Sequence, residues 1–137
     1  MTLPIALDTN LLVRLLTNDD PLQAQRTAER IDGSSACFVP ITVTLELEWV
    51  LRGAYRLPPA VVIEAIEALM TIPQLHLEQE DQVRRALDLH RQGMDFAAAL
   101  HLLRSEGCSA LVTLDRALER TASRLNTLPP VQLLTQA

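Results

Sequence analysis

The chain has 137 residues, of which 48% are apolar, so it can bury one hydrophobic core and is not an intrinsically disordered chain. With only two cysteines, the chain is not a disulfide scaffold. No run approaches the roughly 18 uncharged apolar residues of a membrane span. The first residues do not have the basic segment and apolar run of a secretory signal. Seventeen acids stand against twelve basic residues that are all arginine, which excludes lysine chemistry and means that a nucleic acid would need a local arginine patch or a metal ion.

Short apolar runs alternate with longer helical patterns from one end of the chain to the other. Asp8 stands where a helix cap is needed, and Pro21 follows Asp20 at the first position of a helix. Gly107 suits the left-handed position after a helix. In chain order the pattern predicts a strand at 4–7, helices at 11–17 and 21–31, a strand at 37–39, helices at 42–55 and 59–70, a strand at 75–77, helices at 79–91 and 95–106, a strand at 110–113, a helix at 116–125 and a strand at 131–134.

Strands that are separated by helices and too apolar to alternate indicate a parallel sheet with helices on both faces. We therefore predict an α/β fold with about five parallel strands, in a single cytoplasmic domain over residues 1–137 that contacts no membrane. Ligands of such sheets bind beyond the carboxyl ends of the strands, so acids at these ends are the first candidates for a site.

Two aspartates follow predicted strands directly. Asp8 ends the first apolar run and Asp115 follows the run that includes Thr113. Each of them also precedes a helix, so capping is a sufficient reason for either one alone. Two such carboxylates in one sheet would repel each other if their strands are neighbours, and a positive group would then have to offset them.

Glu46 lies in the most apolar predicted helix, on a stripe at helical spacing with Trp49 and Gly53. A carboxylate on a partly buried stripe is costly unless it is paired or binds a metal, so we assign Glu46 to the candidate site. Glu48 is about 200° further round the helix and is expected to face solvent.

Carboxylates that converge at strand ends make a hard oxygen site, which suits Mg²⁺ or Mn²⁺. The cysteines are far apart in sequence and the three histidines form no ligand pair, so no zinc pattern competes. A hydrated divalent ion at such a site can activate water and neutralise a phosphodiester. The acids therefore predict metal-assisted phosphodiester hydrolysis.

The chain resembles a PIN domain, and within that family a VapC-type toxin of a bacterial toxin–antitoxin pair. The resemblance covers nearly the whole chain in the right order. It rests on these segments: Ile5–Asn10, Asp20-Pro21 with Gln23, Glu46–Arg52, Asp95–Leu100, Gly107-Cys108 and Val112–Asp115.

The resemblance implies a five-stranded parallel sheet and Mg²⁺- or Mn²⁺-dependent endoribonuclease activity. It also implies a homodimer that is inhibited by a small cognate antitoxin. The positions of Asp8, Glu46 and Asp115 match acidic metal-site positions of the family. Thr9, Asn10 and Thr113 are implied to lie near the site.

One position departs from the family pattern Asp-Phe-Ala-Asp-Ala-Leu. Asp95 matches the first acid of that pattern, but Ala98 stands where a second acid normally completes the site. An aspartate at the start of a helix points at the free N–H groups of the first turn, so Asp95 is less well placed to reach a metal than position 98. Three readings stay open: activity with three acids or with Asp95 added, a catalytically inactive relative, or an inactivating substitution.

Other families fit less well. A signalling receiver domain needs a lysine near its acids, and a haloacid-dehalogenase-type phosphatase needs Asp-x-Asp where this chain has Asp8-Thr9-Asn10. The main alternative is an inactive PIN-fold module that binds RNA or protein. Arg14 and Arg52 are our candidates for substrate contacts. The resemblance implies that the surface around a set of apolar residues forms the dimer and receives the antitoxin: Trp49, Val61, Val62, Ile66 and Leu69.

Overall fold

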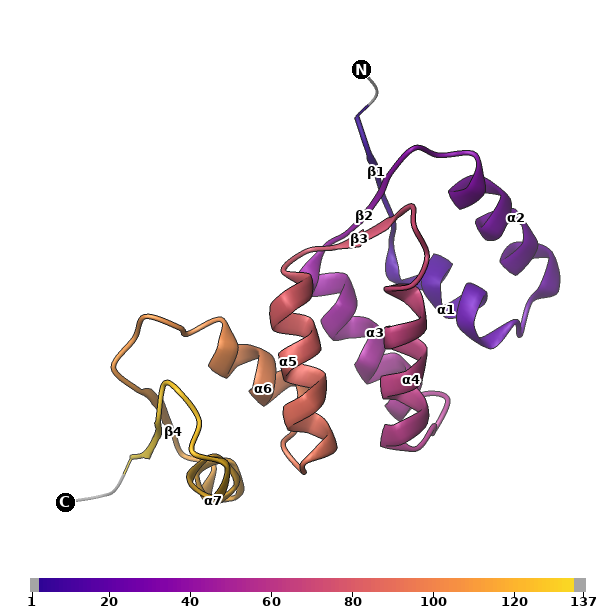
Figure 1. The fold of residues 1–137 in the computed structure, drawn as a ribbon. Helices are drawn as coiled ribbons and strands as arrows, with labels where there is room; N and C mark the ends of the chain where they lie inside the picture. Colours follow the sequence, from indigo (N-terminus) through magenta and orange to yellow (C-terminus); the bar gives the residue numbers. More distant parts are fainter. Residues whose placement is uncertain (1–2, 135–137) are drawn as a thin grey trace. The chain divides into compact units, whose positions relative to one another are not determined.

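The structure, a computed structural model, describes residues 3–134, which form a mixed α/β fold (Figure 1). Within this range there are seven helices and five strands. The chain divides into two compact units, the first running to Glu80 and the second beginning at Asp81. No helix among the described residues is long and apolar enough to cross a membrane.

The first unit contains a three-stranded parallel sheet with the strand order β1-β2-β3. Its strands are β1 (Ile5–Ala6), β2 (Cys37–Val39) and β3 (Leu75–Leu77). Side chains alternate along the last two strands, because Cys37 and Val39 are buried whereas Phe38 is 36% exposed and His76 is exposed. The apolar runs predicted that helices cover both faces of the sheet. At Phe38 and His76 this cover is incomplete.

Four helices connect these strands. They are α1 (Thr9–Thr17), α2 (Pro21–Asp32), α3 (Ile41–Gly53) and α4 (Pro59–Leu69). Helix α1 packs against α2 and α3, and α3 packs against α4 (Figure 1). The core of the unit includes Leu12, Leu51 and Ile66, none of which is measurably exposed.

The helix starts follow from local capping. Asp8 accepts a hydrogen bond from the Thr9 N–H at 2.7 Å, so α1 begins two residues before the predicted start. Asp20 accepts one from the Gln23 N–H at 3.1 Å, with Pro21 in the first turn as the sequence predicted.

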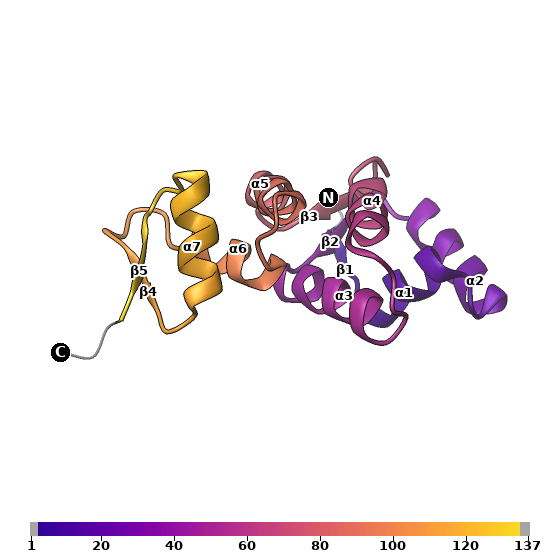
Figure 2. The same ribbon diagram turned by 90° about the horizontal axis from the view of Figure 1, so that it is seen from below.

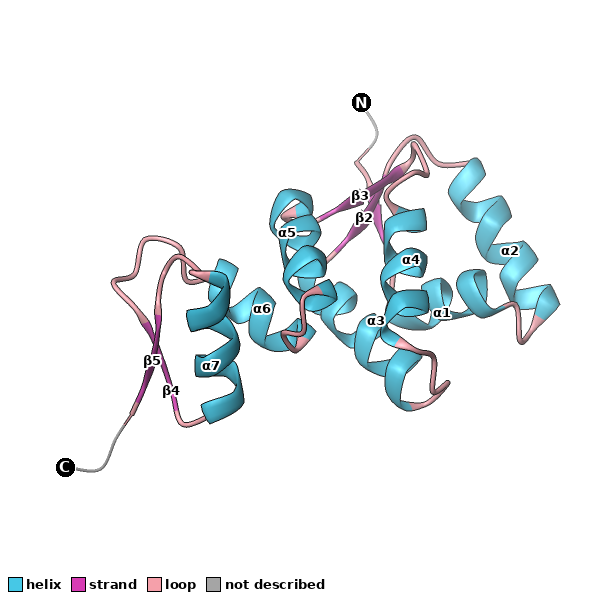
Figure 3. Cartoon of the chain, turned by 60° about the horizontal axis from the view of Figure 1, so that its bottom comes forward, coloured by secondary structure: helices cyan, strands magenta, loops and turns pink. Residues whose placement is uncertain are grey.

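The second unit contains the parallel pair β4 (Leu111–Thr113) and β5 (Val131–Leu133), in which Leu111 lies opposite Val131. Helix α7 (Arg116–Leu125) connects the two strands and lies alongside them, as Figures 2 and 3 show. The remaining helices are α5 (Glu80–Arg91) and α6 (Phe96–Leu103).

Helix α6 ends earlier than the predicted residue 106. After Leu103 the chain continues through turns to Gly107, whose φ of +92° is the left-handed geometry that the sequence predicted there. The predicted α/β class with five parallel strands is confirmed, with the strands arranged as a sheet of three and a sheet of two.

Candidate functional site

All three candidate aspartates are exposed helix caps. Asp8 caps α1, Asp95 caps α6 through the Ala98 N–H at 3.1 Å, and Asp115 caps α7 through the Leu118 N–H at 3.0 Å. Each uses one carboxylate oxygen for this bond, and the other oxygen makes no hydrogen bond to any residue in the range 3–134. Capping therefore accounts for the position of each aspartate and leaves one oxygen of each able to bind a further group.

Glu46 lies beside the end of β1. Its Oε1 accepts a hydrogen bond of 2.5 Å from the Thr9 hydroxyl, and Thr9 follows Asp8 in the chain. Thr9 is 3% exposed, so its hydroxyl is held in place by the surrounding core, whereas Asp8 and Glu46 are both exposed. Glu46 is thus held against the residue that directly follows Asp8, although the two acids are 38 positions apart in sequence.

The face of α3 that is buried differs from the predicted one. The stripe predicted to be partly buried is exposed, with Trp49 62% exposed and Glu46 also exposed. The buried face carries Thr44, Leu47, Glu48 and Leu51. Leu47 and Leu51 pack in the core. Glu48 lies on the same face of the helix, one turn after Thr44, and is therefore buried as well.

The expectation that Glu48 faces solvent is therefore wrong. Glu48 is 1% exposed, and its Oε2 accepts a hydrogen bond from the Arg52 Nε at 2.8 Å. Arg52, a candidate for substrate contacts, is thus an ion-pair partner of a buried acid, although its own side chain is 42% exposed.

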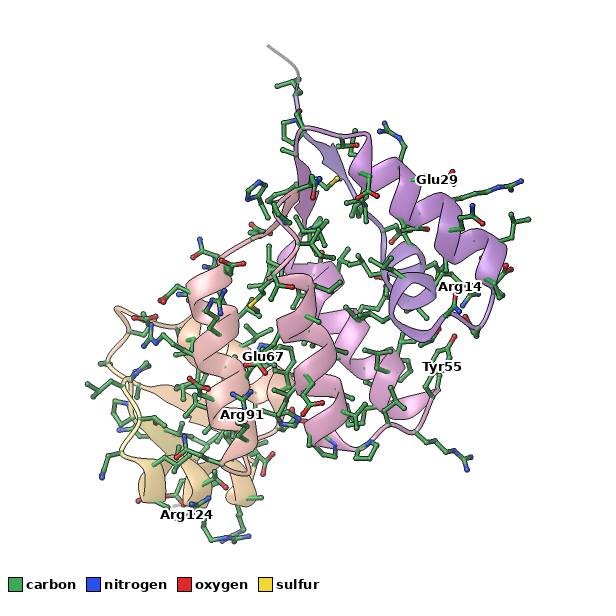
Figure 4. All side chains as sticks on the ribbon, turned by 45° about the vertical axis from the view of Figure 1, so that its right-hand side comes forward. Arg14, Glu29, Tyr55, Glu67, Arg91 and Arg124 are labelled. Carbon is green, nitrogen blue, oxygen red and sulfur yellow. The ribbon has the colours of Figure 1, made fainter. Side chains whose placement is uncertain are left out.

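Arg14, the other candidate for substrate contacts, belongs to a polar network. Its Nε donates to Gln23 at 2.9 Å, and its Nη1 donates to Asp19 at 3.2 Å and to the Tyr55 hydroxyl at 3.1 Å. Figure 4 shows the side chains of Arg14 and Tyr55 directed toward one another.

Asp19 is the acceptor at the centre of this network. The Tyr55 hydroxyl donates to it at 2.6 Å and the Thr17 hydroxyl at 2.9 Å. The hydrogen bond from Tyr55, more than the one from Thr17 or the charge of Arg14, holds the pKa of Asp19 below its ordinary value of 3.8.

A pocket of about 350 Å³ lies between α1 and α2, and sequence reasoning missed it. Its polar lining includes Arg14, Arg26 and Arg30. Arg26 and Arg30 are four residues apart on α2, so their helical spacing was the available signal. The apolar lining consists of Leu7 and Leu11, on either side of Asp8 in the chain.

The candidate acids are divided between the two units. Asp8 and Glu46 belong to the first, and Asp95 and Asp115 to the second. Neither unit by itself, over residues 3–134, brings together three histidine, cysteine or acidic side chains able to hold a metal ion. Convergence of all these acids on one ion stays a prediction.

The three polar residues that the resemblance places near the site have clear local positions. Thr9 bonds Glu46, Asn10 lines the pocket between α1 and α2, and the Thr113 hydroxyl accepts from the Asp115 N–H at 3.1 Å. Thr9 and Thr113 thus each contact a candidate acid or its backbone. Ala98 is half-buried in the first turn of α6.

Comparison with known families gives one match, to the PIN domain, over residues 5–124. This span extends across both units and includes Asp8, Glu46, Asp95 and Asp115. No curated protein matches the chain.

Proposed function

This chain belongs to the PIN domain family, and we propose that it is a metal-dependent endoribonuclease, the toxin of a bacterial type II toxin–antitoxin pair. PIN domains are nuclease-type folds that typically use divalent metal ions. The match covers residues 5–124, which supports treating residues 1–137 as one PIN domain. A cytoplasmic location is part of the same proposal.

The observation that carries the proposal is the hydrogen bond from Thr9 to Glu46. It holds the Glu46 carboxylate against the residue after Asp8, just beyond the carboxyl end of β1, which is the edge at which parallel sheets bind ligands. Two exposed carboxylates on a fixed backbone would repel each other without a cation.

The donor set fits Mg²⁺ or Mn²⁺. Asp8 and Glu46 offer exposed carboxylate oxygens, and no sulfur or imidazole ligand is needed. Asp8, Glu46 and Asp115 would hold the ion, with Asp95 as the fourth acid of the catalytic group. When bound, the ion supplies an activated water and neutralises charge on the phosphodiester.

The residues around these acids have positioning roles. Thr9 orients Glu46 through its hydroxyl, and Thr113 orients Asp115 through the backbone N–H of that residue. Helix N–H groups hold one oxygen of Asp8 and of Asp115, so each remaining oxygen has a fixed direction toward a cation or a phosphate.

The toxin role requires a homodimer and a cognate antitoxin. Trp49 on α3 is 62% exposed and Val61 on α4 is 43% exposed, and both helices pack together in the first unit. Large exposed apolar side chains support a protein-binding surface there. We assign this surface to the dimer or to the antitoxin.

The experiment is cleavage of a folded RNA with Mn²⁺ and with EDTA. Cleavage should require Mn²⁺ and should be lost in Asp8→Asn, because asparagine caps a helix as well as aspartate but carries no charge. Asp32→Asn, which removes an exposed acid at the end of α2, should cleave like the unchanged chain. Cleavage that persists in EDTA would contradict a metal-dependent mechanism.

A second candidate function is an inactive PIN-fold module that binds RNA or protein. Ala98 favours it, because a methyl group stands where the family pattern has an acid. The same assay on the unchanged chain separates the two functions: an inactive module shows no Mn²⁺-dependent cleavage, whereas a ribonuclease weakened by Ala98 cleaves slowly and loses that cleavage in Asp8→Asn.

A further inference from the structure

The pocket between α1 and α2 concentrates the positive charge of the first unit. Residues 1–80 contain five arginines and eleven acids, and three of the five arginines line this pocket. None of the acids lines it. The pocket is therefore a local reversal of the charge of its own unit, which is what an anionic ligand needs on an acidic protein.

The three arginines differ in how far they are already paired. Arg14 is held by Asp19, Gln23 and Tyr55, and the Arg30 Nη1 donates to the Ser34 hydroxyl at 2.8 Å. Arg26 is exposed and has no hydrogen-bond or ion-pair partner in the part of the chain that the structure describes. The charges of Arg26 and Arg30 are therefore not offset by any acid of the pocket, and Arg26 has all its donors available.

The remaining lining is apolar or neutral. Leu7 is 3% exposed and Leu11 is 39% exposed, and Asn10, Gln23 and Thr27 complete the wall. A volume of about 350 Å³ is at the lower end of the range for small-molecule sites. A pocket lined by both apolar side chains and guanidinium groups suits a flat base that carries a phosphate, since arginine both stacks on bases and pairs with phosphates.

A pocket of similar size in the second unit lacks this charge pattern. It has a volume of about 340 Å³, its lining includes Asp88, and its arginine, Arg85, is paired with Glu106 at 2.8 Å. Pocket volume alone therefore does not distinguish the first pocket. The first pocket differs because no acid lines it and because Arg26 and Arg30 form no ion pair with an acid in the range 3–134.

We propose that the pocket between α1 and α2 binds one nucleotide of the RNA strand, next to the phosphodiester that is cut at Asp8. The Arg26 and Arg30 guanidiniums take the phosphate, and the base lies on Leu7 and Leu11. This inference rests on the proposed ribonuclease function. The pocket is next to Asp8 in the chain, because Leu7 precedes Asp8 directly and Asn10 follows it by two residues. The pocket would thus fix the register of the strand at the acids.

The test measures binding without turnover. A fluorescent single-stranded oligoribonucleotide is titrated with the protein in EDTA, and its anisotropy is followed over a series of salt concentrations. Arg26→Gln should weaken binding about tenfold, the loss expected for one hydrogen-bonded charge pair. It should also lower the slope of log affinity against log salt by about 0.7, the value for one phosphate contact on a single strand.

The matched control is Arg56→Gln, which removes an exposed arginine of the same unit outside the pocket. It should change neither the affinity nor the slope. Arg30→Gln should weaken binding as Arg26→Gln does, and an abasic strand of equal length should bind less tightly than the base-bearing strand. Thermal unfolding of Arg26→Gln should match that of the unchanged chain, because Arg26 has no partner within residues 3–134 to lose.

Three results would overturn the inference. Equal losses in Arg26→Gln and Arg56→Gln would show that only net charge matters. Equal binding of the abasic strand would show that no base binds in the pocket. Displacement of RNA by an acidic peptide at equal concentration would show that the pocket binds protein instead of RNA. Failure of the ribonuclease proposal is a separate result, because Asp8→Asn leaves the pocket intact and should bind RNA in EDTA like the unchanged chain.

Discussion

Asp19 shows how one hydrogen bond ties two distant segments together. Tyr55, 36 positions later in the chain, donates to a carboxylate at the end of the α1–α2 turn, and the same hydroxyl accepts from Arg14. Because the folded state holds the pKa of Asp19 below 3.8, this carboxylate contributes stability above that pH and loses its contribution as the pH falls through the folded pKa.

We predict that Tyr55→Phe raises the pKa of Asp19 toward 3.8, since it removes the largest cause of the lowered value. The measurement is a titration of the Asp19 carboxyl carbon by NMR. Thr17→Val is the control, because it removes the smaller hydrogen bond and should raise the pKa less. An equal pKa in the unchanged chain and in Tyr55→Phe would contradict this account.

Glu48 and Arg52 give a second test at the level of single residues. Removing one partner of a buried ion pair leaves an unpaired charge, and Glu48 is 1% exposed. Arg52→Ala should therefore lower the free energy of unfolding by about 2–3 kcal/mol, somewhat below the usual loss for a buried pair because the arginine is partly exposed. Denaturant unfolding measures this loss.

The same substitution separates stability from RNA binding. If Arg52 serves Glu48 and not the substrate, Arg52→Ala should leave RNA affinity in EDTA unchanged. Adding Glu48→Gln to Arg52→Ala should recover part of the lost stability, because the remaining buried group is then neutral. A loss of RNA affinity without a loss of stability would restore Arg52 as a substrate contact.

Most helices and strands were predictable because their ends are marked locally. Asp8, Asp20 and Asp115 cap helices at or near their expected starts, and β2 and β3 have the predicted bounds. The buried face of α3 was not predictable in the same way. Its sequence is apolar almost all round, so only packing decides that Leu47 and Leu51 face inward and that Glu48 goes with them.

Helix α6 carries the main prediction for a single element. Ala98 lies in its first turn, where the N–H groups at the helix start favour an acidic side chain. Asp95 already accepts the Ala98 N–H with one carboxylate oxygen, which leaves only its other oxygen for a metal ion. A carboxylate at position 98 would not be occupied by that hydrogen bond.

We predict that Ala98→Asp raises Mn²⁺-dependent RNA cleavage by orders of magnitude over the unchanged chain. The comparison is made at saturating Mn²⁺ under single-turnover conditions, with Ala98→Asn as the uncharged control. Without metal, the added carboxylate should lower the melting temperature if it joins other acids, because like charges then repel. Equal cleavage by the unchanged chain and Ala98→Asp would show that the existing acids suffice.

For the whole molecule, the apolar surface around Trp49 predicts self-association. Trp49 is the only tryptophan and is 62% exposed, so its fluorescence reports directly on whether a second copy covers it. We predict a shift of its emission to shorter wavelength as protein concentration rises, together with a melting temperature that rises in parallel. Sedimentation of a monomer at high concentration, with emission unchanged, would contradict the dimer.

The candidate site was predictable from sequence only in part. Asp8 and Asp115 are recognisable because each directly follows a short apolar run, and Glu46 because it interrupts an apolar helix. Arg26 and Arg30 gave only the weak signal of their helical spacing, since α2 is largely polar and exposed arginines on a polar helix are ordinary. Their role depends on the opposing wall formed by Leu7 and Leu11, which is a tertiary property.

The proposed metal-dependent mechanism requires that acids of both units bind a single divalent ion. Paramagnetic Mn²⁺ broadens the NMR signals of nearby amides, so a titration of ¹⁵N-labelled protein tests this claim directly. We predict that the amides of Thr9, Glu46 and Arg116 broaden together at the same Mn²⁺ concentration, and that Asp8→Asn removes all three effects. Broadening of Thr9 and Glu46 with Arg116 unchanged at saturating Mn²⁺ would contradict the claim.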